Sequence, residues 1–593
     1  MAEKIVSPGV FTNEIDQTFL PAAIGDIGAA IIGPTVKGPA LVPTVVNSFN
    51  EFEQLFGTTF QSGSSFYQYL TSHTAENYLK NGGPLTVVRV MDGTFGPASA
   101  KISGSDNTLS LTLTSLADGR GQNSAQFNDL AGKGGIVGTD SGLASGSKDN
   151  LRFEIVGRNT NKGTFNLNIR RGDDLQSRKQ VLESWNNLSL DPNSTNYVAK
   201  RIGDKYYDIT TDSDGTTYLK SNGDFAVKSK YVRVTVNRPT VDYLDSNGGV
   251  RVSGDSAFIP ALGSGSYNGG FDGGADGDTV QGFSTQKFYN NITAANVQGF
   301  DLSAAASSTN ATQRYKDAIN LLGNQDEYDF NLLLLPGVND EDHSEIVTTA
   351  LNVAETRGDV FVIVDPVRYG RSLTQVTTEA ATRDSSYGAM YWPWVQIRDQ
   401  QLGLNRWVPP SVVMSGIYSF NDKVAHPWFA PAGLNRGGID TAVQAERKLT
   451  HNNRDDLYDS NVNPIATFPG QGICAWGQKT LQKKESALDR VNVRRLLIKL
   501  KKFIASTSKF LVFEQNNVAT RNKFLNIVNP FLEQVQSNSG LTAFKVIMDD
   551  TNNTPDQIDR NILFGQIFIQ PTRTAEFIVL DFTVQPTGAT FPE

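Results

Sequence analysis

Cysteine and histidine are scarce in this sequence. Among 593 residues there is one cysteine, Cys474, and there are four histidines. A single cysteine rules out an internal disulfide and is typical of a reducing compartment. Its neighbours Ile473, Ala475 and Trp476 favour a small buried side chain over a reactive thiol. The cysteine and the histidines show no zinc-ligand spacing, so we expect no metal site of this kind.

Long apolar runs and an excess of positive charge are also absent. No stretch of about 18 apolar residues occurs, so we expect no direct membrane insertion. The start, MAEKIVSPGV, lacks the apolar region of a secretory signal, and we expect the protein to stay where it is made. The formal net charge is -8, which argues against a nucleic-acid partner. Any basic surface must therefore be local.

Strand-like and helix-like patterns alternate in two parts of the chain. In residues 21–96, the strand-like runs AAIIG and PTVV precede two helix patterns, NSFNEFEQLFG, capped by Asn47 or Ser48, and SFYQYLTSHTAENYLKNGG. A buried strand, LTVVRVMD, follows them. The rhythm returns in residues 286–449 with NLLLLPG, a helix through EDHSEIVTTALNVAETRG, and VFVIVDP. The alternation predicts one layered α/β middle domain formed by both parts.

The residues between these two parts have a different composition. Residues 97–285 are rich in Gly, Ser, Asn, Asp and Thr, with short alternating runs such as LSLTLTSL and YVRVTVNR. This pattern predicts a β-rich outer domain inserted into the α/β domain. The rest of the chain is predicted to form an extended N-terminal arm (1–20), a C-terminal α+β domain (450–576) and a C-terminal strand arm (577–593). The predicted fold class is therefore α/β and α+β, multidomain.

Motifs that suggest an enzyme or a metal site are isolated in this sequence. GTDSG, at 138–142, lies in a Gly/Ser-rich loop, and no histidine stands in a triad context. NGGFDGGADGD, at 268–278, lacks the closing Glu of a calcium loop and the Lys of a phosphate loop. An α/β enzyme would need polar residues where NLLLLPG and VFVIVDP end; Asn339 and Asp365 stand there, but no base or nucleophile joins them. We therefore predict no enzymatic activity and no cofactor or metal.

Residues 463–481, NPIATFPGQGICAWGQKTL, combine turn-forming residues with the cysteine and a tryptophan. Proline and glycine here would let the chain reverse sharply, and Ile473, Cys474 and the tryptophan would anchor the loop in the C-terminal domain. The segment is interpreted as a scaffold that sets the angle of the next helix. The predicted turn and anchor residues are Pro464, Pro469, Gly470, Gly472 and Trp476.

A basic helix follows, in SALDRVNVRRLLIKLKKFI. Apolar residues at 493, 496, 497, 500, 503 and 504 recur with the spacing of one helical face. From Lys479 to Lys509, ten basic residues stand against Glu485 and Asp489, a surplus of eight. One interpretation is a solvated surface helix, and the other is a contact surface for an acidic partner. The candidate contact residues are Arg494, Arg495, Lys499, Lys501 and Lys502.

Both ends of the chain have strand patterns without a hairpin partner nearby. The segments AFKVIMDD and LFGQIFIQ are predicted to pair with each other, which leaves two open sheet edges. The candidate arm residues are Val10, Phe11, Thr12, Asn13 and Ile15 at the N-terminal end, and Ile578, Leu580, Phe582 and Val584 at the C-terminal end.

Several stretches of the sequence, in the order in which they occur along the chain, carry a resemblance to a known protein family. These are SPGVFTNEI, SLDPNSTNYVAKRIGD (189–204), VPPSVVMSGIYSFNDKVAHPWFAPAG (408–433), LYDSNVNPIATFPGQGICAWGQKTL with RVNVRRLLIKLKKFI, and DDTNNTPDQIDRNILFGQIFIQPTRTAEFIVLDF (549–582). An asparagine-proline turn, a PGxGI run, a tryptophan-glycine pair and a VNVRRL helix follow one another in the fourth stretch. In these features the chain resembles the contractile tail sheath proteins of large contractile-tailed bacteriophages.

The resemblance implies a structural subunit that stacks as hexameric rings around a tail tube and contracts to drive the tube through the host envelope. The implied partners are copies of itself, the tail tube protein, and baseplate and tail terminator proteins. It also implies a place in the virion, with assembly in the bacterial host cytoplasm, and a C-terminal domain completed by strand arms of neighbouring subunits. Two alternatives stay open: another virion structural protein, such as a tube or capsid subunit, or the sheath of a tailocin or related injection machine.

Overall fold

A mixed sheet lies at the centre of the molecule. The structure is a computed structural model that describes residues 28–62, 65–119, 151–172, 174, 179–261, 269–277, 289–307 and 310–578. Among these residues, eight strands pair in the order β2-β5-β1-β15-β16-β17-β21-β22, and only the outer strands β2 and β22 run antiparallel to their neighbours. The strands are β1 (Gly28–Gly33), β2 (Thr44–Val46), β5 (Leu85–Arg89), β15 (Phe330–Asn339), β16 (Phe361–Asp365), β17 (Gly388–Trp392), β21 (Val462–Phe468) and β22 (Gly472–Ala475).

The strands of this sheet are apolar because helices cover it. Every residue of β1, β5, β16 and β17 is buried, which is typical of parallel strands that are covered on both faces. Helices α2 and α8 pack together, as do α5 and α6, and each pair also contacts sheet strands. The helices are α1 (Phe49–Phe56), α2 (Leu70–Leu79), α5 (Ala311–Leu321), α6 (Asp340–Arg357), α7 (Leu373–Ala380), α8 (Pro410–Val424) and α9 (His451–Asp459). We call this part, residues 28–89 and 289–481, the sheet domain.

Smaller elements complete the sheet domain. Ser48, and not Asn47, caps α1, since its side chain accepts a hydrogen bond from the backbone N–H of Glu51. The helix predicted to begin at Ser65 begins at Leu70 instead, because residues 65–68 form a hairpin strand. Aromatic residues such as Phe66 and Tyr67 favour strands over helices. The short strands are β3 (Thr59–Ser62), β4 (Ser65–Gln68), β18 (Val395–Arg398), β19 (Asn405–Val408) and β20 (Ala442–Ala445).

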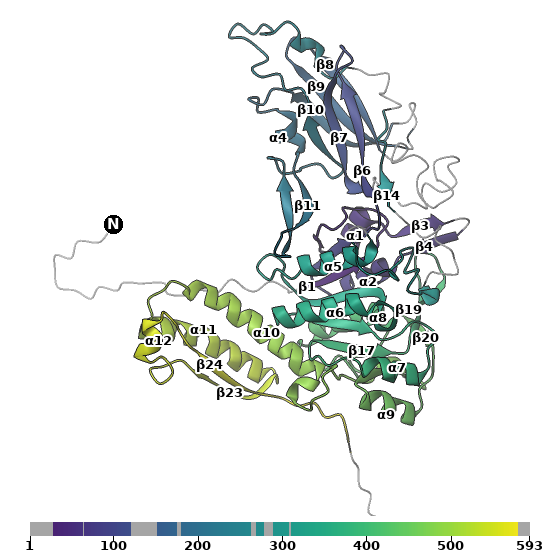
Figure 1. Ribbon diagram of the computed structural model, residues 1–593, viewed down its shortest axis with the longest axis vertical. Coiled ribbons are helices and arrows are strands. Elements are labelled where there is room, and N and C mark those ends of the chain that lie inside the picture. Colours follow the sequence, from purple (N-terminus) through teal and green to yellow (C-terminus); the bar gives the residue numbers. More distant parts are fainter. Residues whose placement is uncertain are drawn as a thin grey trace, which may run out of the picture.

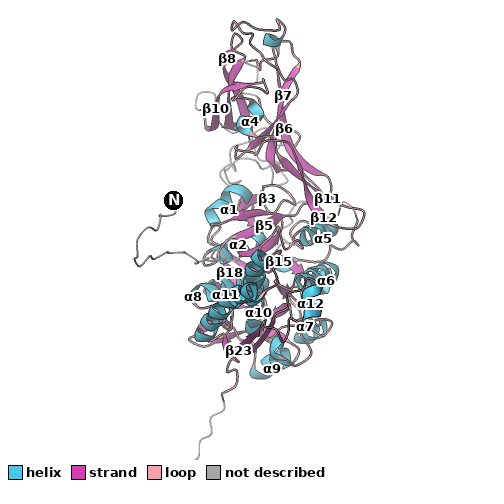
Figure 2. Cartoon of the chain, turned by 90° about the vertical axis from the view of Figure 1, so that its left-hand side faces the viewer, coloured by secondary structure: helices cyan, strands magenta, loops and turns pink. Residues whose placement is uncertain are grey.

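A β-rich part, which we call the outer domain, projects from the sheet domain (Figure 1). It has its own apolar core, in which Phe165, Leu167 and Ile169 are fully buried. Figure 2 shows strands throughout this part, whereas most helices lie in the rest of the molecule. Its elements are β6 (Phe95–Ser103), β7 (Leu109–Asp118), β8 (Leu151–Asn159), β9 (Thr164–Arg171), β10 (Val181–Ser189), α4 (Val198–Ile202), β11 (Tyr206–Thr211), β12 (Thr217–Asn222), β13 (Val232–Val236) and β14 (Ala275–Asp276).

Polar contacts join the outer domain to the sheet domain. Arg89, at the end of β5, donates to the carbonyl of Gly38 at 2.6 Å and to that of Asp118 at 2.7 Å. The carboxylate of Asp118 accepts from the N–H of Ala40 at 2.8 Å. Ile209 of β11 also packs against the core of the sheet domain. The orientation of the outer domain is therefore fixed by more than its two connecting segments.

The last part of the chain forms a lobe beside the sheet domain (Figure 1). We call it the C-terminal domain, residues 483–578. Phe503 of α10 stacks on Phe531 of α11, with ring centroids 3.7 Å apart, over the pair β23–β24. As predicted, AFKVIMDD and LFGQIFIQ supply these two antiparallel strands. The elements are α10 (Val491–Ser508), α11 (Val518–Ser537), β23 (Leu541–Ile547), α12 (Pro555–Asp559) and β24 (Gln566–Pro571).

The predicted fold class is confirmed as a mixed α/β, multidomain chain. The predicted division at residue 449/450 is wrong, because α9, β21 and β22 belong to the sheet domain. Strand β21 lies parallel to β17 and pairs Val462 with Met390. Residues 451–459 form helix α9, which is capped by the side chain of Thr450.

Candidate assembly surfaces

Residues 463–481 form an edge of the central sheet. Pro464 was predicted to form a turn; it is instead a buried strand residue whose register partner is Trp392. The chain reverses later, between Phe468 and Gly472, where Gly470 and Gly472 have φ values of 75° and 86°. These positive values favour glycine, since a Cβ is strained there.

The anchor of this hairpin differs from the prediction in one residue. Ile473 and Cys474 are buried, whereas Trp476 is 42% exposed and packs edge-on against Phe468, with ring centroids 4.6 Å apart. Burial raises the pKa of the Cys474 thiol to about 11. The thiol therefore stays protonated at neutral pH, and the cysteine acts as a packing residue. Since Trp476 is partly exposed, it is not the core anchor that we expected.

Helix α10 lies between two apolar cores. Val491 and Ile498 belong to the core of the sheet domain, whereas Leu496 and Leu500 belong to the core of the C-terminal domain. These two sets recur with helical spacing on different faces. The helix therefore joins the two domains, and little of its surface is left for solvent.

Two arginines of α10 face the sheet domain. Arg495 is 4% exposed, pairs with the carboxylate of Asp422 at 2.5 Å, and lies 4.7 Å above the ring of Tyr418. Arg494 is 5% exposed, donates to the hydroxyl of Ser386, and lies 4.1 Å above the ring of Tyr387. Both guanidinium groups thus bind partners within the chain, which makes them part of the domain junction.

Lys502, one to two turns further along, pairs with one buried and one exposed carboxylate. Its ammonium group lies 2.6 Å from Asp329 and 3.3 Å from Asp359, and it also donates to the carbonyl of Phe330. Arg357 holds Asp359 through two further hydrogen bonds of 2.9 and 3.1 Å. Since the side chain of Lys502 is only 6% exposed, this residue also belongs to the junction.

The hypothesis that all five basic residues face a partner is therefore wrong for Arg494, Arg495 and Lys502. The sequence shows charge at helical spacing, but it does not show that carboxylates and aromatic rings of the sheet domain lie opposite. Lys501 is exposed and Lys499 is half-buried. These two lysines stay as candidates for a contact outside the subunit.

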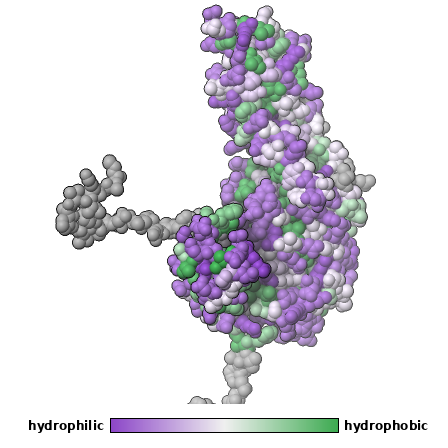
Figure 3. Space-filling view, turned by 60° about the vertical axis from the view of Figure 1, so that its left-hand side comes forward, coloured by the Kyte–Doolittle hydropathy of each residue, from purple (hydrophilic) through white to green (hydrophobic). Residues whose placement is uncertain are grey.

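An exposed apolar loop lies between α10 and α11, and the sequence analysis did not single it out. Phe513 is fully exposed at 101%, and its φ of 70° is unusual for a bulky residue. Phe510 and Val512 are 62% and 60% exposed. On the face that Figure 3 shows, hydrophilic residues predominate and apolar ones form small separate areas. The signal in the sequence is the run KFLVF beyond the last turn of the helical pattern.

The predicted strand arms fall mostly outside the described residues. Residues 10–15 lie outside them, as do Leu580, Phe582 and Val584. Ile578 is described, and it is 80% exposed, like Phe577 at 78%. Within the described part of the chain, β23 and β24 pair only with each other. Among these described residues, neither outer edge of the pair bonds to a further strand.

The carboxyl ends of β15 and β16 bring Asn339 and Asp365 together as register partners. Asn339 caps α6 by accepting from the N–H of Asp342, and Asp365 accepts from the N–H and the hydroxyl of Ser411 at the start of α8. Burial raises the pKa of Asp365 to about 7. The nearby ring of His343 accepts from the N–H of Asn339, and burial lowers its pKa to about 4. Each polar group here therefore supports a helix start.

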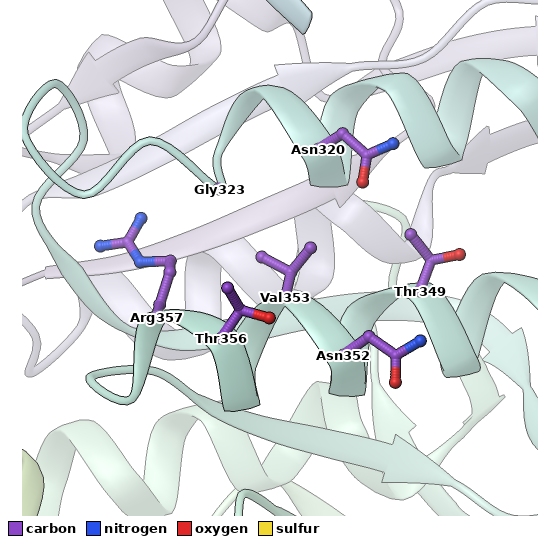
Figure 4. A pocket seen from close by; sticks show the side chains of 7 residues that line it. All are labelled: Asn320, Gly323, Thr349, Asn352, Val353, Thr356 and Arg357. Carbon is purple, nitrogen blue, oxygen red and sulfur yellow. The ribbon is translucent and has the colours of Figure 1, made fainter. Parts of the chain in front are cut away.

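No reactive group lines the hollow between α5 and α6 (Figure 4). This hollow of about 250 Å³ is lined by Asn320 of α5 and by Thr349, Asn352 and Thr356 of α6, with Arg357 at one end. The guanidinium of Arg357 is already bound by Asp359. Among the described residues, no group of three or more His, Cys, Asp or Glu side chains could hold a metal ion. In the same part of the chain, no helix is both long enough and apolar enough to cross a membrane.

Comparison with known protein families agrees with this architecture. Residues 309–481 match the model of the phage tail sheath protein central domain, and residues 483–585 match that of the phage tail sheath C-terminal domain. The chain belongs to the phage tail sheath family. The two family models meet at residue 482, after β22, which agrees with the domain division in the structure.

Individual members of the tail sheath family match different lengths of the chain. The tail sheath protein of Vibrio phage KVP40 is 26% identical over 703 positions that cover 99% of both chains. The tail sheath protein of Enterobacteria phage T4 is 37% identical over 195 residues, or 33% of this chain and 30% of that one. The sheath tail protein of Listeria innocua has a similar fold, with a TM-score of 0.50, 10% identity, and coverage of 89% and 90% of the two chains. The chain is thus a contractile tail sheath subunit.

Proposed function

We propose that this chain polymerises as stacked hexameric rings around a tail tube and contracts to drive the tube through the host envelope. The observation that carries this proposal is the full-length match to a tail sheath protein. The partners would be copies of the chain, the tube protein, and baseplate and terminator proteins, and the place of action would be the virion, after assembly in the host cytoplasm. Nothing in this role requires a cofactor or an enzymatic site. The sheath of a tailocin or a related injection machine is the alternative.

Electron microscopy of the purified chain tests this role. A sheath subunit should form striated hollow polymers with a lumen wide enough for a separate tube. A tube subunit should form narrow smooth polymers, and a capsid subunit closed shells. A chain that stays monomeric at high concentration, with and without tube protein, would contradict the proposal.

The strand arms are the proposed links between neighbouring subunits. We assign residues 10–15 and 578–584 to this role because the pair β23–β24 has two open edges in the described structure. Lys499 and Lys501 are proposed to contribute to the tube or neighbour contact. A surface ion pair is worth only about 0–1 kcal/mol, but many copies around a ring act together.

The outer domain should be dispensable for polymerisation, because it has its own core. We expect deletion of residues 97–285, replaced by a short Gly/Ser bridge, to leave a folded chain that still forms polymers visible by electron microscopy. This variant lacks Asp118 and therefore its hydrogen bond with Arg89, but Arg89 can still donate to the carbonyl of Gly38. Ile209→Ser in the full chain is the control for the lost packing on the sheet domain. A deletion variant with a normal thermal transition but no polymers would contradict this domain assignment.

The loop at 510–513 should contribute to contacts between molecules. Phe513 is fully exposed, so its side chain does not pack in a core. Phe513→Ser should therefore change the free energy of unfolding by less than about 0.5 kcal/mol. Burying a phenylalanine at an interface is worth about 1.5–3 kcal/mol, so the concentration needed for polymerisation should rise about tenfold or more. Sedimentation of polymers measures this. Val252→Ser, an exposed apolar change in the outer domain, is the control, and an equal effect of both would count against the loop.

A further inference from the structure

A single carboxylate holds the segment that follows β24. One oxygen of Glu576 accepts from the Nε of Arg490 at 2.9 Å and from the side-chain amide of Gln478 at 2.9 Å. The other oxygen accepts from the hydroxyl of Tyr458 at 2.8 Å. The amide of Gln478 also donates to the hydroxyl of Thr574 at 2.6 Å. Hydrogen bonds to a charged acceptor are about twice as strong as neutral ones.

The partners of Glu576 come from both sides of the domain division. Tyr458 is on α9 and Gln478 follows β22, and both lie in the part that matches the central domain of the family. Arg490 is the N-cap residue of α10, and it lies with Glu576 in the part that matches the C-terminal domain. The segment after β24 therefore crosses from its own domain to the sheet domain before the chain continues.

The exposed fraction of the side chains rises sharply after Glu576, where the hydrogen-bonded contact with the sheet domain ends. The side chain of Glu576 is 18% exposed, whereas Phe577 and Ile578 are 78% and 80% exposed. Tyr458 is itself held, because the ammonium of Lys479 lies 4.5 Å from its ring centroid and donates to its carbonyl. Gln478 is 3% exposed. The receiving groups are thus buried or braced, whereas the next two side chains after Glu576 are mostly exposed.

We propose that Glu576 is the anchor of the C-terminal arm. It fixes the chain to the sheet domain, so that the hydrogen bonds of Glu576, and not the pairing of β24 with β23, resist a force applied to residues 577–593. The inference rests on the proposed linking role of the arms. Without the anchor, only the hydrogen bonds of Thr574 with Gln478 and of Thr572 with Gly540 would resist a pull before it reached Pro571. Leu541, the register partner of Pro571, ends the β23–β24 ladder, which would then open one hydrogen bond at a time. A ladder of two strands is only marginally stable by itself.

The anchor also sets where the arm begins. Release of Glu576 would leave residues 572–576 held only by the hydrogen bonds of Thr574 with Gln478 and of Thr572 with Gly540. Once these open as well, the free arm becomes longer by about 17 Å when extended. A longer and unfixed arm reaches its binding site on a neighbour less often, because the effective concentration falls with length and with lost orientation. Glu576 is therefore a positioning residue for the link between subunits.

The test compares variants of the full-length, unpolymerised chain by trypsin cleavage after Arg573, which requires the segment to leave its anchor. Glu576→Ala should raise the cleavage rate at least tenfold. Tyr458→Phe, which removes one hydroxyl and keeps the ring, should raise it severalfold. Glu485→Ala is the matched control. Glu485 is an exposed carboxylate that lines the same surface hollow as Glu576 and Arg490 but takes no part in these hydrogen bonds, so its replacement should leave the rate unchanged.

Polymer yield of the same variants, with thermal unfolding as the check on folding, completes the test. A folded Glu576→Ala variant that polymerises much less well than Glu485→Ala supports the anchor. Unchanged cleavage after Arg573 overturns the anchor alone, whatever the polymers do. Faster cleavage with normal polymerisation overturns its positioning role. If removal of residues 577–593 leaves polymerisation intact, the linking role of the arms fails, and the anchor loses its purpose with it.

Discussion

Removal of residues 1–16, or of residues 577–593, is expected to give a folded monomer that does not polymerise. Neither deletion touches a buried residue of the described structure, and the second leaves Glu576 in place. The pair β23–β24 would then keep its two open edges, with Phe568 54% exposed on β24. A strand that adds about five hydrogen bonds at about 1 kcal/mol each would contribute on the order of 5 kcal/mol per arm before ordering entropy.

Sedimentation and electron microscopy measure this effect, and thermal unfolding shows that the truncated chain is folded. Removal of residues 586–593 alone is the matched control, because it keeps the alternating run that ends at Val584. This shorter deletion should polymerise normally. A chain without residues 1–16 or 577–593 that assembled and contracted like the full chain would refute the arm hypothesis.

The central sheet of the sheet domain could be predicted in large part, because its strands are buried on both faces. Runs such as AAIIG and VFVIVDP have no polar face, and they are bounded by turn residues and helix patterns. The pairing of β23 with β24 was also predictable, since one polar connection joins two apolar segments. Boundaries were harder to predict, as α2 shows: an apolar aromatic run before a helix has no local mark that separates strand from helix.

Pro464 shows why the domain division was wrong. A proline in a strand usually argues against a central position, because it lacks the N–H that a ladder needs. Here the carbonyl of Pro464 accepts from the N–H of Trp476, so its nitrogen also points toward β22 and away from β17. The pairing with β22 begins only at Ile465, so no ladder bond is lost. This tolerance depends on a neighbouring strand that the local sequence does not reveal.

The prediction that the basic helix is a contact surface was wrong for three of its five residues, for a related reason. Periodicity finds the face with Leu496 and Leu500, but Val491 and Ile498 also enter a core, and the cations between them meet Asp422 and Asp359. These acidic partners are far from the helix in the sequence. Part of the local surplus of positive charge is therefore paired within the subunit, by carboxylates that only the structure brings close to the helix.

Replacement of Lys502 by methionine should therefore destabilise the folded chain strongly, by about 3 kcal/mol or more. Methionine has a similar length, so the change removes the charge and the three donors and leaves the volume nearly intact. Asp359 is 3% exposed and would lose one of its two cations, and the carbonyl of Phe330 would lose its donor. Breaking a buried ion pair from one side typically costs about 3–5 kcal/mol. Asp359 keeps Arg357, so we expect the lower end of this range, to which the unpaired carbonyl of Phe330 contributes.

Lys501→Met is the matched control for this prediction. Lys501 is the preceding residue of the same helix, it is exposed, and its ammonium group reaches the hydroxyl of Tyr387 only at 3.4 Å. Its replacement should change the free energy of unfolding by no more than about 0.5 kcal/mol. Asp329→Asn should also have a small effect, because its side chain is 66% exposed and surface pairs contribute about 0–1 kcal/mol. Thermal and urea unfolding of the three variants decide the matter: if Lys502→Met is no less stable than Lys501→Met, this ion cluster does not hold α10 to the sheet domain.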